Sequence, residues 1–295
     1  MNISETLERL AEAISIPDVV ICTVGTVLFA VWLVKSSFGR DALADSVPRR
    51  NNMPAHLPFV LLFIWFVLIG TGALLTTGLV DSLEEWQGAF VDNAVVCASG
   101  AAATVVIIFL ARAHFARRLK GFGLNVKTIH KDIFGAVINL LAAWPFVTGA
   151  IALTFLLGLL TKGPEFEIER HESLTQIGAY EQTPLRILIA VVAVVVAPLL
   201  EEMLFRGLFQ TTIRSLLAES RLGKRLGNSW AVPWLSILIA SGLFATVHAY
   251  AGHWPALFVL GICMGYAYEK SGSLFRPIFI HALFNTTSVI AAFYQ

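Results

Sequence analysis

The sequence predicts an all-α membrane protein, a bundle of about eight transmembrane helices preceded by a short N-terminal interfacial helix. The observations behind this prediction are the composition, the apolar runs and the charge of the loops between them. Hydrophobic residues fill 57% of the 295 positions, charged residues fill 14%, and the mean hydropathy is +0.74. A soluble domain carries roughly a quarter charged residues, because its surface faces water. Lipid must therefore cover much of this chain.

Eight stretches are apolar enough to cross a bilayer, for which a helix needs about 20 residues. They lie near residues 17–35, 57–80, 89–112, 133–161, 185–209, 231–250, 255–270 and 274–294, and the seventh is the shortest. No internal repeat is visible, and no stretch is long enough for a separate soluble domain. We expect one integrated membrane domain, in which residues 1–130 hold the interfacial helix and three spans and residues 131–295 hold the other five.

The N-terminal segment is acidic and lacks the apolar core of a secretory signal peptide. Ile3, Leu7, Leu10 and Ile14 recur at helical spacing, which predicts an amphipathic helix on the membrane surface. The net charge of the chain is +1, which gives no electrostatic basis for binding nucleic acid. The partner that the composition predicts is the lipid bilayer.

Basic and non-basic loops alternate along the chain, and the basic loops of a membrane protein lie in the cytoplasm. The connections after the first, third, fifth and seventh spans are basic, whereas the second and sixth lack Lys and Arg and the fourth is acid-rich. The third connection is the most basic, with Arg112, Arg117, Arg118, Lys120, Lys127 and Lys131. This alternation fits eight spans and predicts that both termini lie outside the cytoplasm.

Three charged residues interrupt the fifth apolar run, and charges at membrane depth persist mainly when they are paired or functional. Glu202 and Arg206 are four residues apart, so they share a helix face and are expected to form an ion pair. Glu201 points about 100° away from its neighbour and is left without that partner. The alternative is that all three charges form one structural cluster.

Two histidines and an amide stand at matching intervals on later spans. Phe244 and His248 are four apart on the sixth span, and His281 and Asn285 are four apart on the eighth. A single buried histidine is more often a core residue than a catalyst, and a membrane asparagine is often a bond between helices. Together with an unpaired carboxylate, however, these side chains form a set suited to activating water.

The segments EEMLFR, FATVH and HALFN resemble the motifs EExxxR, FxxxH and HxxxN of the CPBP family of intramembrane proteases. That family includes the type II CAAX prenyl endopeptidases and bacterial relatives linked to bacteriocin self-immunity. The motifs occur in the family's order, and the resemblance covers roughly Arg186 to Gln295, while the first four spans match only in hydrophobicity. The resemblance implies an intramembrane endopeptidase of a bacterial cell membrane, acting on a membrane-associated peptide or protein, such as a CAAX-type prenylated tail.

The side chains predict a role for each motif, and the resemblance implies the same roles. Glu201 is the expected general base for water, and His248 holds the same water and passes its proton to the leaving amine. His281 and Asn285 donate hydrogen bonds to the oxyanion, each worth about 3 kcal/mol. Phe244 packs beside the site.

Metal dependence is an open alternative, with zinc as the candidate ion and Glu201, His248 and His281 as its ligands. Because a side-chain amide is a poor zinc ligand, the residue set favours metal-free glutamate chemistry. Glu202 and Arg206 are expected to be structural.

Depth in the membrane presents a conflict for this site. At 1.5 Å per residue the expected span boundaries separate Glu201 from His248 by roughly 15 Å along the membrane normal. The two residues can meet if the fifth helix continues past Phe209 towards Leu217, or if the sixth helix is tilted or displaced.

Other membrane functions were compared with this prediction. A rhomboid-like serine protease would use Ser241 with His248, but seven residues on one helix separate them by roughly 10 Å. An aspartyl protease needs two membrane aspartates, and Asp92 is the only candidate. The main alternative is a transporter or scaffold in which the buried ionisable residues form a relay.

Overall fold

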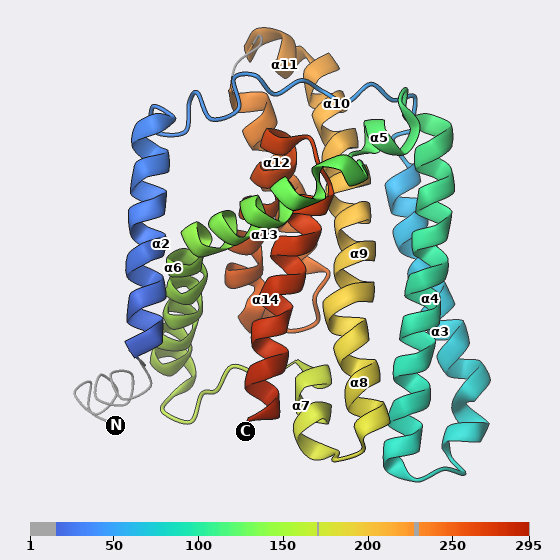
Figure 1. Cartoon of the computed structure of the whole chain (residues 1–295). Coiled ribbons are helices and arrows are strands. Elements are labelled where there is room, and N and C mark those ends of the chain that lie inside the picture. The colour runs from blue at the N-terminus through green and yellow to red at the C-terminus, as the bar shows by residue number, and fades with distance from the viewer. Residues whose placement is uncertain (1–15, 170, 227–229, 295) are drawn as a thin grey trace.

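The computed structural model describes residues 16–169, 171–226 and 230–294. Within these ranges the chain forms helices and no strand, and one isolated bridge pairs Asn51 with Phe115, so the all-α prediction is confirmed. The helices stand side by side as a bundle (Figure 1). The interfacial helix predicted from Ile3, Leu7, Leu10 and Ile14 lies outside the described residues.

The chain contains both long and short helices. The first part contains α2 (Ile16–Lys35), α3 (Leu57–Val80), α4 (Glu85–His114), α5 (Arg118–Phe122), the 3₁₀ turn η1 (Val126–Thr128), α6 (Ile129–Lys162) and α7 (Glu172–Ala179). The second part contains α8 (Thr183–Val191), η2 (Val192–Val196), α9 (Ala197–Glu202), η3 (Met203–Gln210), α10 (Thr211–Glu219), α11 (Arg221–Leu226), α12 (Ala231–Thr246), η4 (Ala251–His253), α13 (Trp254–Ser271) and α14 (Phe275–Phe293).

Helices occupy all eight predicted stretches, but fewer of them have the length and composition of a membrane span. Five qualify among the described residues: Pro17–Lys35, Leu57–Val80, Glu85–His114, Val126–Lys162 and Thr183–Glu219. The apolar helix α12 is shorter, with 16 residues. The structure thus supports a membrane protein with five candidate spans, and a count of eight spanning helices stays a prediction.

The fifth predicted span is one continuous helical run that includes two π-helical stretches. It extends from α8 through η2, α9, η3 and α10, and it ends at Glu219. The continuation past Phe209 is therefore present, and α12 ends early, at Thr246. Both features reduce the depth difference between Glu201 and His248. The predicted conflict in depth is absent from the structure, in which Oε2 of Glu201 lies 3.9 Å from Nε2 of His248.

The C-terminal helices form the centre of the bundle. Helix α13 packs against α6 and α12, and α14 packs against α6, α13, α9 and η2. Helix α2 covers α6 on one side, and α3 covers α4 on the other (Figure 1). Helix α6 changes direction along its length (Figure 1), and it contains Pro145, which removes a backbone hydrogen bond from the helix interior.

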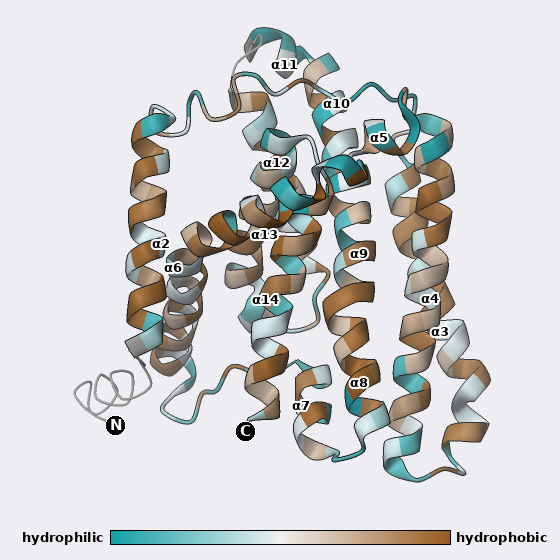
Figure 2. Cartoon of the chain, in the orientation of Figure 1, coloured by the Kyte–Doolittle hydropathy of each residue, from teal (hydrophilic) through white to brown (hydrophobic). Residues whose placement is uncertain are grey.

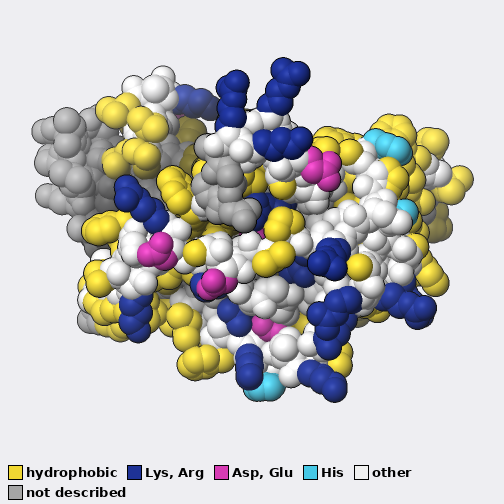
Figure 3. Space-filling model, turned by 90° about the horizontal axis from the view of Figure 1, so that it is seen from above, with side chains coloured by type: hydrophobic (Ala, Val, Ile, Leu, Met, Phe, Trp, Pro, Cys, Tyr) yellow, Lys and Arg dark blue, Asp and Glu magenta, His cyan; other side chains and the backbone are white. Residues whose placement is uncertain are grey.

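The two ends of the bundle differ in charge. Hydrophobic residues dominate the middle of the long helices, whereas hydrophilic residues gather around α5 and α11 at the upper end (Figure 2). Seen from above, this end carries many lysine and arginine side chains (Figure 3). The start of α2 and the end of α14 lie at the opposite end (Figure 1). Basic connections on one side fit the predicted orientation, which stays a prediction.

A buried carboxylate fixes the start of α14, the helix that carries His281. Asp132, 1% exposed, lies 3.3 Å from Nε of Arg276. Its Oδ2 accepts hydrogen bonds from the hydroxyls of Thr128 at 2.7 Å and Ser273 at 2.6 Å. These contacts join the start of α6 to the start of α14, and they set the height of α14 in the bundle.

Candidate active site

Glu201 faces two imidazoles from other helices. Its Oε2 lies 3.9 Å from Nε2 of His248 and 4.0 Å from Nε2 of His281. These separations are too long for direct hydrogen bonds. The same oxygen is buried and has no hydrogen-bond partner among the described residues. The structure thus brings together three of the predicted site residues, from α9, α14 and the end of α12.

Glu202 faces Arg206, as the four-residue spacing predicts. Its Oε2 lies 3.0 Å from Nε of Arg206, and the two side chains are 0% and 1% exposed. An unpaired charge in this environment would cost several kcal/mol, so each residue depends on the other. The predicted ion pair is confirmed, and the carboxylate of Glu201 has no such cation.

Phe244 is the common neighbour of these polar groups. Its ring is fully buried and meets the rings of His248 and His281 edge to face, with centroids 4.9 and 5.7 Å apart. The guanidinium carbon of Arg206 lies 4.4 Å from the centroid of Phe244, within the range of a cation–π contact. Phe244 therefore contacts both the Glu202–Arg206 ion pair, through Arg206, and the two histidines.

His281 is held by Glu202 as well as facing Glu201. Its Nδ1 lies 3.0 Å from Oε1 of Glu202, and since a carboxylate accepts, Nδ1 carries the proton. The Nε2 atom is then directed at Glu201. Sequence spacing predicted Arg206 as the partner of Glu202 and did not predict this contact. No local pattern indicates it, since the partners are 79 residues apart.

His248 is oriented by its own helix. Its Nδ1 lies 2.8 Å from the carbonyl oxygen of Phe244, so Nδ1 is the donor and Nε2 of a neutral ring is an acceptor facing Glu201. The carbonyl of His248 accepts a hydrogen bond from the indole of Trp254 at 2.9 Å. These bonds fix the ring just beyond the end of α12, where the helix gives way to a turn.

Asn285 binds a backbone carbonyl that the fifth helical run leaves open. In η2 the N–H of Ala197 donates to Val192, five residues back. The next donor in this pattern would be Pro198, which has no N–H. The carbonyl of Ala193 therefore receives no backbone hydrogen bond from position 198. Nδ2 of Asn285 donates to that carbonyl at 2.7 Å. This bond is the interhelical role weighed for Asn285, and it leaves the second N–H of the amide for another acceptor.

A further histidine lies close to the site from outside the three motifs. His171 begins α7, where its Nδ1 accepts from the N–H of Ser173, and its ring contacts Tyr250 at a centroid distance of 6.2 Å. Partial burial, followed by the nearby His248, lowers the pKa of His171 below its ordinary value. No sequence pattern predicts a role for this position, because His171 stands alone in an acid-rich loop.

The rival protease sites are not assembled. Ser241 is 1% exposed, and its hydroxyl has no hydrogen-bond partner among the described residues. It packs against Gly261 of α13, so it belongs to a helix crossing. Asp92 is an exposed residue of α4.

Zinc stays an open alternative for this site. In the described part of the chain, no group of three or more His, Cys, Asp or Glu side chains is arranged to hold a metal ion. Glu201, His248 and His281, the ligands expected for zinc, lie with Nε2 of each histidine 3.9 and 4.0 Å from Oε2 of Glu201.

Comparison with known proteins identifies the region that carries these residues. Residues 183–287 match the family model described as type II CAAX prenyl endopeptidase Rce1-like. An Escherichia coli protein described as "Uncharacterized 24.3 kDa protein" is 29% identical over 140 residues, which is 46% of this chain and 58% of that protein. No solved structure matches the chain. The resemblance indicated by the three motifs is confirmed over residues 183–287, and it suggests a CAAX-type intramembrane protease.

Proposed function

We propose that this chain, similar to the type II CAAX prenyl endopeptidases over residues 183–287, hydrolyses a peptide bond of a membrane-associated substrate. The observation that carries the proposal is the environment of Glu201, whose Oε2 has no partner and lies 3.9 and 4.0 Å from two imidazoles. A water molecule between two acceptors at such a distance can donate one hydrogen bond to each of the two. The site is thus suited to holding and activating water.

In the proposed mechanism Glu201 is the general base. The carboxylate takes a proton from water as the oxygen attacks the scissile carbonyl. His248 accepts from the same water through Nε2, because its Nδ1 proton is committed to Phe244. The proton then reaches the nitrogen of the leaving amine when the carbon–nitrogen bond breaks. The products are a carboxylic acid and an amine, so one water is consumed.

His281 and Asn285 are the proposed oxyanion donors. Because Nδ1 of His281 already donates to Glu202, Nε2 can donate to the oxyanion only when it carries a second proton. Asn285 retains one N–H beside the bond to Ala193. Each donor is expected to contribute about 3 kcal/mol to the transition state.

The substrate class is proposed from similarity and from general chemistry. A helical peptide hides its carbonyls in its own hydrogen bonds, so the segment to be cut must be extended or unwound. A prenylated C-terminal tail meets this requirement and carries its own membrane anchor.

The chemistry proposed is metal-free. We therefore expect the purified protein to contain no zinc and to keep full activity in a strong chelator.

The test is cleavage by the purified full-length protein in detergent or vesicles. The probe is a fluorogenic peptide with a prenylated CAAX end, compared with the same peptide without the lipid. We expect the wild-type chain to cleave the probe, and we expect the Glu201→Ala and His248→Ala variants not to cleave it. If both variants cleave as fast as wild type, the enzyme proposal is wrong. Loss of solute flux through vesicles in both variants, without proteolysis by any form, would support the transporter alternative instead.

A further inference from the structure

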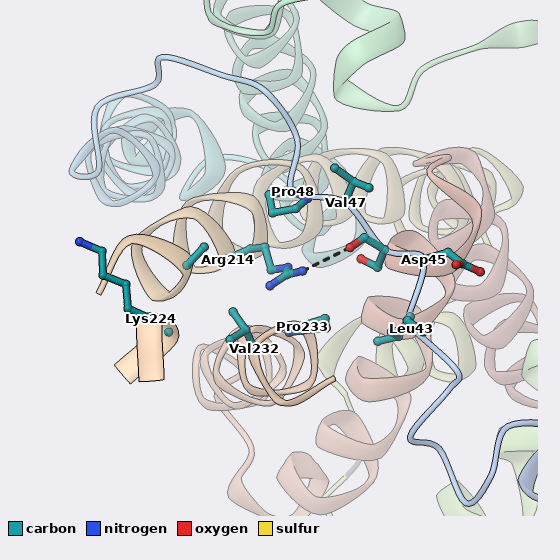
Figure 4. Close-up of a pocket in the computed structure, with 12 residues that line it drawn as sticks. Leu43, Asp45, Val47, Pro48, Arg214, Lys224, Val232 and Pro233 are labelled. Carbon is teal, nitrogen blue, oxygen red and sulfur yellow. Dashed lines mark hydrogen bonds between the residues drawn. The ribbon is translucent and has the colours of Figure 1, made fainter. Parts of the chain in front are cut away.

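A polar cavity lies at the basic end of the bundle, far from Glu201. It measures about 390 Å³, and it is bordered by residues 43–48 of the loop after α2, by the end of α10, by α11 and by the first turn of α12. Figure 4 shows Arg214 of α10 reaching between this loop and α12. Arg214 follows Glu201 by 13 residues on one helical run, which is about 20 Å. The cavity is therefore separate from the proposed site of hydrolysis.

Arg214 is a buried cation without a carboxylate partner. The residue is 8% exposed, and it forms no ion pair with the described part of the chain. Its one hydrogen bond there runs from Nη2 to the carbonyl of Ser46 at 3.4 Å, while Nε is buried without a partner. Burying a charge without an ion pair in contact is costly. A guanidinium that keeps free donors beside a cavity is suited to binding an anion.

No acidic residue of the described chain lies within ion-pair distance of Arg214, and Glu269 offsets its charge only from farther away. Both carboxylate oxygens of Glu269 are engaged, since Oε2 accepts from Ser46 at 2.6 Å and Oε1 accepts from Gln210 at 3.3 Å. Asp45 is exposed, and its carboxylate points away from Arg214 (Figure 4). Lys224 also lines the cavity, with its amino group turned outwards (Figure 4), and adds a second positive charge at the opening.

We propose that this cavity binds a phosphate group, with Arg214 as its principal contact. Phosphate matches the planar fork of a guanidinium, which can donate two parallel hydrogen bonds. The cavity lies at the end of the candidate span Thr183–Glu219, among the basic loops (Figure 3). Basic pockets at this level bind the headgroups of anionic lipids. A phospholipid headgroup and a soluble phosphate share this chemistry.

The experiment titrates the purified full-length protein in detergent with phosphatidylglycerol, phosphatidylcholine or inorganic phosphate. Native mass spectrometry and thermal unfolding give the Kd and the shift in Tm. We expect Arg214→Gln to weaken binding of the favoured phosphate source by about 10-fold or more, which corresponds to about 1.4 kcal/mol. Arg112→Gln is the matched control, because Arg112 is an exposed residue of α4 that does not line the cavity.

A cavity-filling variant protects the test against misfolding of Arg214→Gln. Ala44 lines the cavity and is exposed, so Ala44→Phe fills the space while the guanidinium stays in place. If the protein prefers phosphatidylglycerol and both cavity variants abolish that preference, the cavity is a lipid site. If it binds inorganic phosphate and both variants abolish that binding, the ligand is soluble. Equal binding of both lipids that neither cavity variant weakens, with no response to phosphate, overturns the proposal. Equal losses in Arg112→Gln and Arg214→Gln also overturn it, because they indicate surface charge alone.

Discussion

Glu202 accepts a hydrogen bond from Nδ1 of His281 at 3.0 Å through one oxygen and faces Arg206 at 3.0 Å through the other. One buried carboxylate thus joins the ion pair on the fifth helical run to the imidazole on α14. The adjacent Glu201 has no comparable partner. Neighbouring glutamates in one helical turn therefore have different environments, one suited to structure and one to chemistry.

The two glutamates are expected to separate stability from activity. Glu202→Gln leaves the fully buried Arg206 without its counter-charge, which should cost about 3–5 kcal/mol of folding free energy. Glu201→Gln removes the proposed base but no ion pair with a cation, so its stability should stay close to that of wild type. Thermal unfolding and peptide cleavage should be measured on both variants. Equal stability losses in the two would contradict this division of roles.

Phe244 is expected to contribute to the site as well as to the core. Phe244→Leu removes the ring that contacts both histidines and Arg206, and we expect cleavage to fall by about 10-fold, the equivalent of one cation–π contact. Phe209→Leu is the matched control, since Phe209 is 2% exposed and packs on Phe59 and Phe205. Both changes should cost roughly 1–2 kcal/mol of stability.

For the Phe244 prediction, kcat/KM and Tm are the quantities to compare. If Phe209→Leu reduces kcat/KM as much as Phe244→Leu at equal Tm, the ring contacts with the histidines have no specific effect.

The crossing of α12 and α13 is expected to depend on glycine. A Cβ on Gly261 would come 2.9 Å from Cβ and 3.2 Å from Cα of Ser241, so Gly261→Ala should force the helices apart and cost roughly 1–3 kcal/mol. Gly242→Ala meets no atom within 4 Å and should stabilise the helix by about 0.5–1 kcal/mol. Chemical or thermal unfolding distinguishes the two. Similar effects from both would exclude a tight crossing at Gly261.

Ser241 itself is expected to be dispensable for hydrolysis. Its hydroxyl lacks a partner among the described residues, so Ser241→Ala should retain full cleavage and equal or higher stability. The measurement is kcat/KM beside Tm. Loss of cleavage without loss of stability would contradict this prediction and support the serine-protease alternative.

The pH dependence of stability is expected to include His171. Burial and then His248 lower its pKa from the ordinary 6.5, so the unfolded chain binds this proton more tightly than the folded chain. Stability is complete above pH 6.5 and decreases as the pH falls through 6.5 towards the lowered value. His171→Asn keeps a residue that caps α7 but cannot titrate. It should lose less stability than wild type between pH 7.5 and pH 5, as measured by Tm, and equal losses would contradict the assignment.

Local features of the fold were predictable from the sequence. The apolar runs located the eight stretches that form helices, and the four-residue spacing gave the pair of Glu202 and Arg206. These features depend on periodicity along one helix. The acid-rich connection was expected to be a loop, but it also contains α7 (Glu172–Ala179), whose few apolar residues are too short a run to detect.

Contacts between distant helices were not predictable. The bond from His281 to Glu202 joins residues 79 apart, and the bond from Asn285 to Ala193 joins residues 92 apart. Spacing within a helix cannot show which faces meet after packing. The π-helical stretches add a second difficulty, since they change the angle between successive residues. The motifs identified which side chains to compare, and the packing determined their partners.

The short helix α12 has a consequence for the surrounding lipid. Sixteen residues extend about 24 Å, less than the roughly 30 Å thickness of a hydrocarbon core. The turn after it, beside His248, thus ends short of the lower edge that α4 and α14 reach (Figure 1). With α12 as the sixth predicted span, acyl chains that border Leu238 and Ile239, both 40% exposed, would have to shorten or splay to match this hydrophobic mismatch. A dimple in the leaflet next to the turn would bring interfacial water, and the polar end of an anchored tail, down to the level of the imidazole.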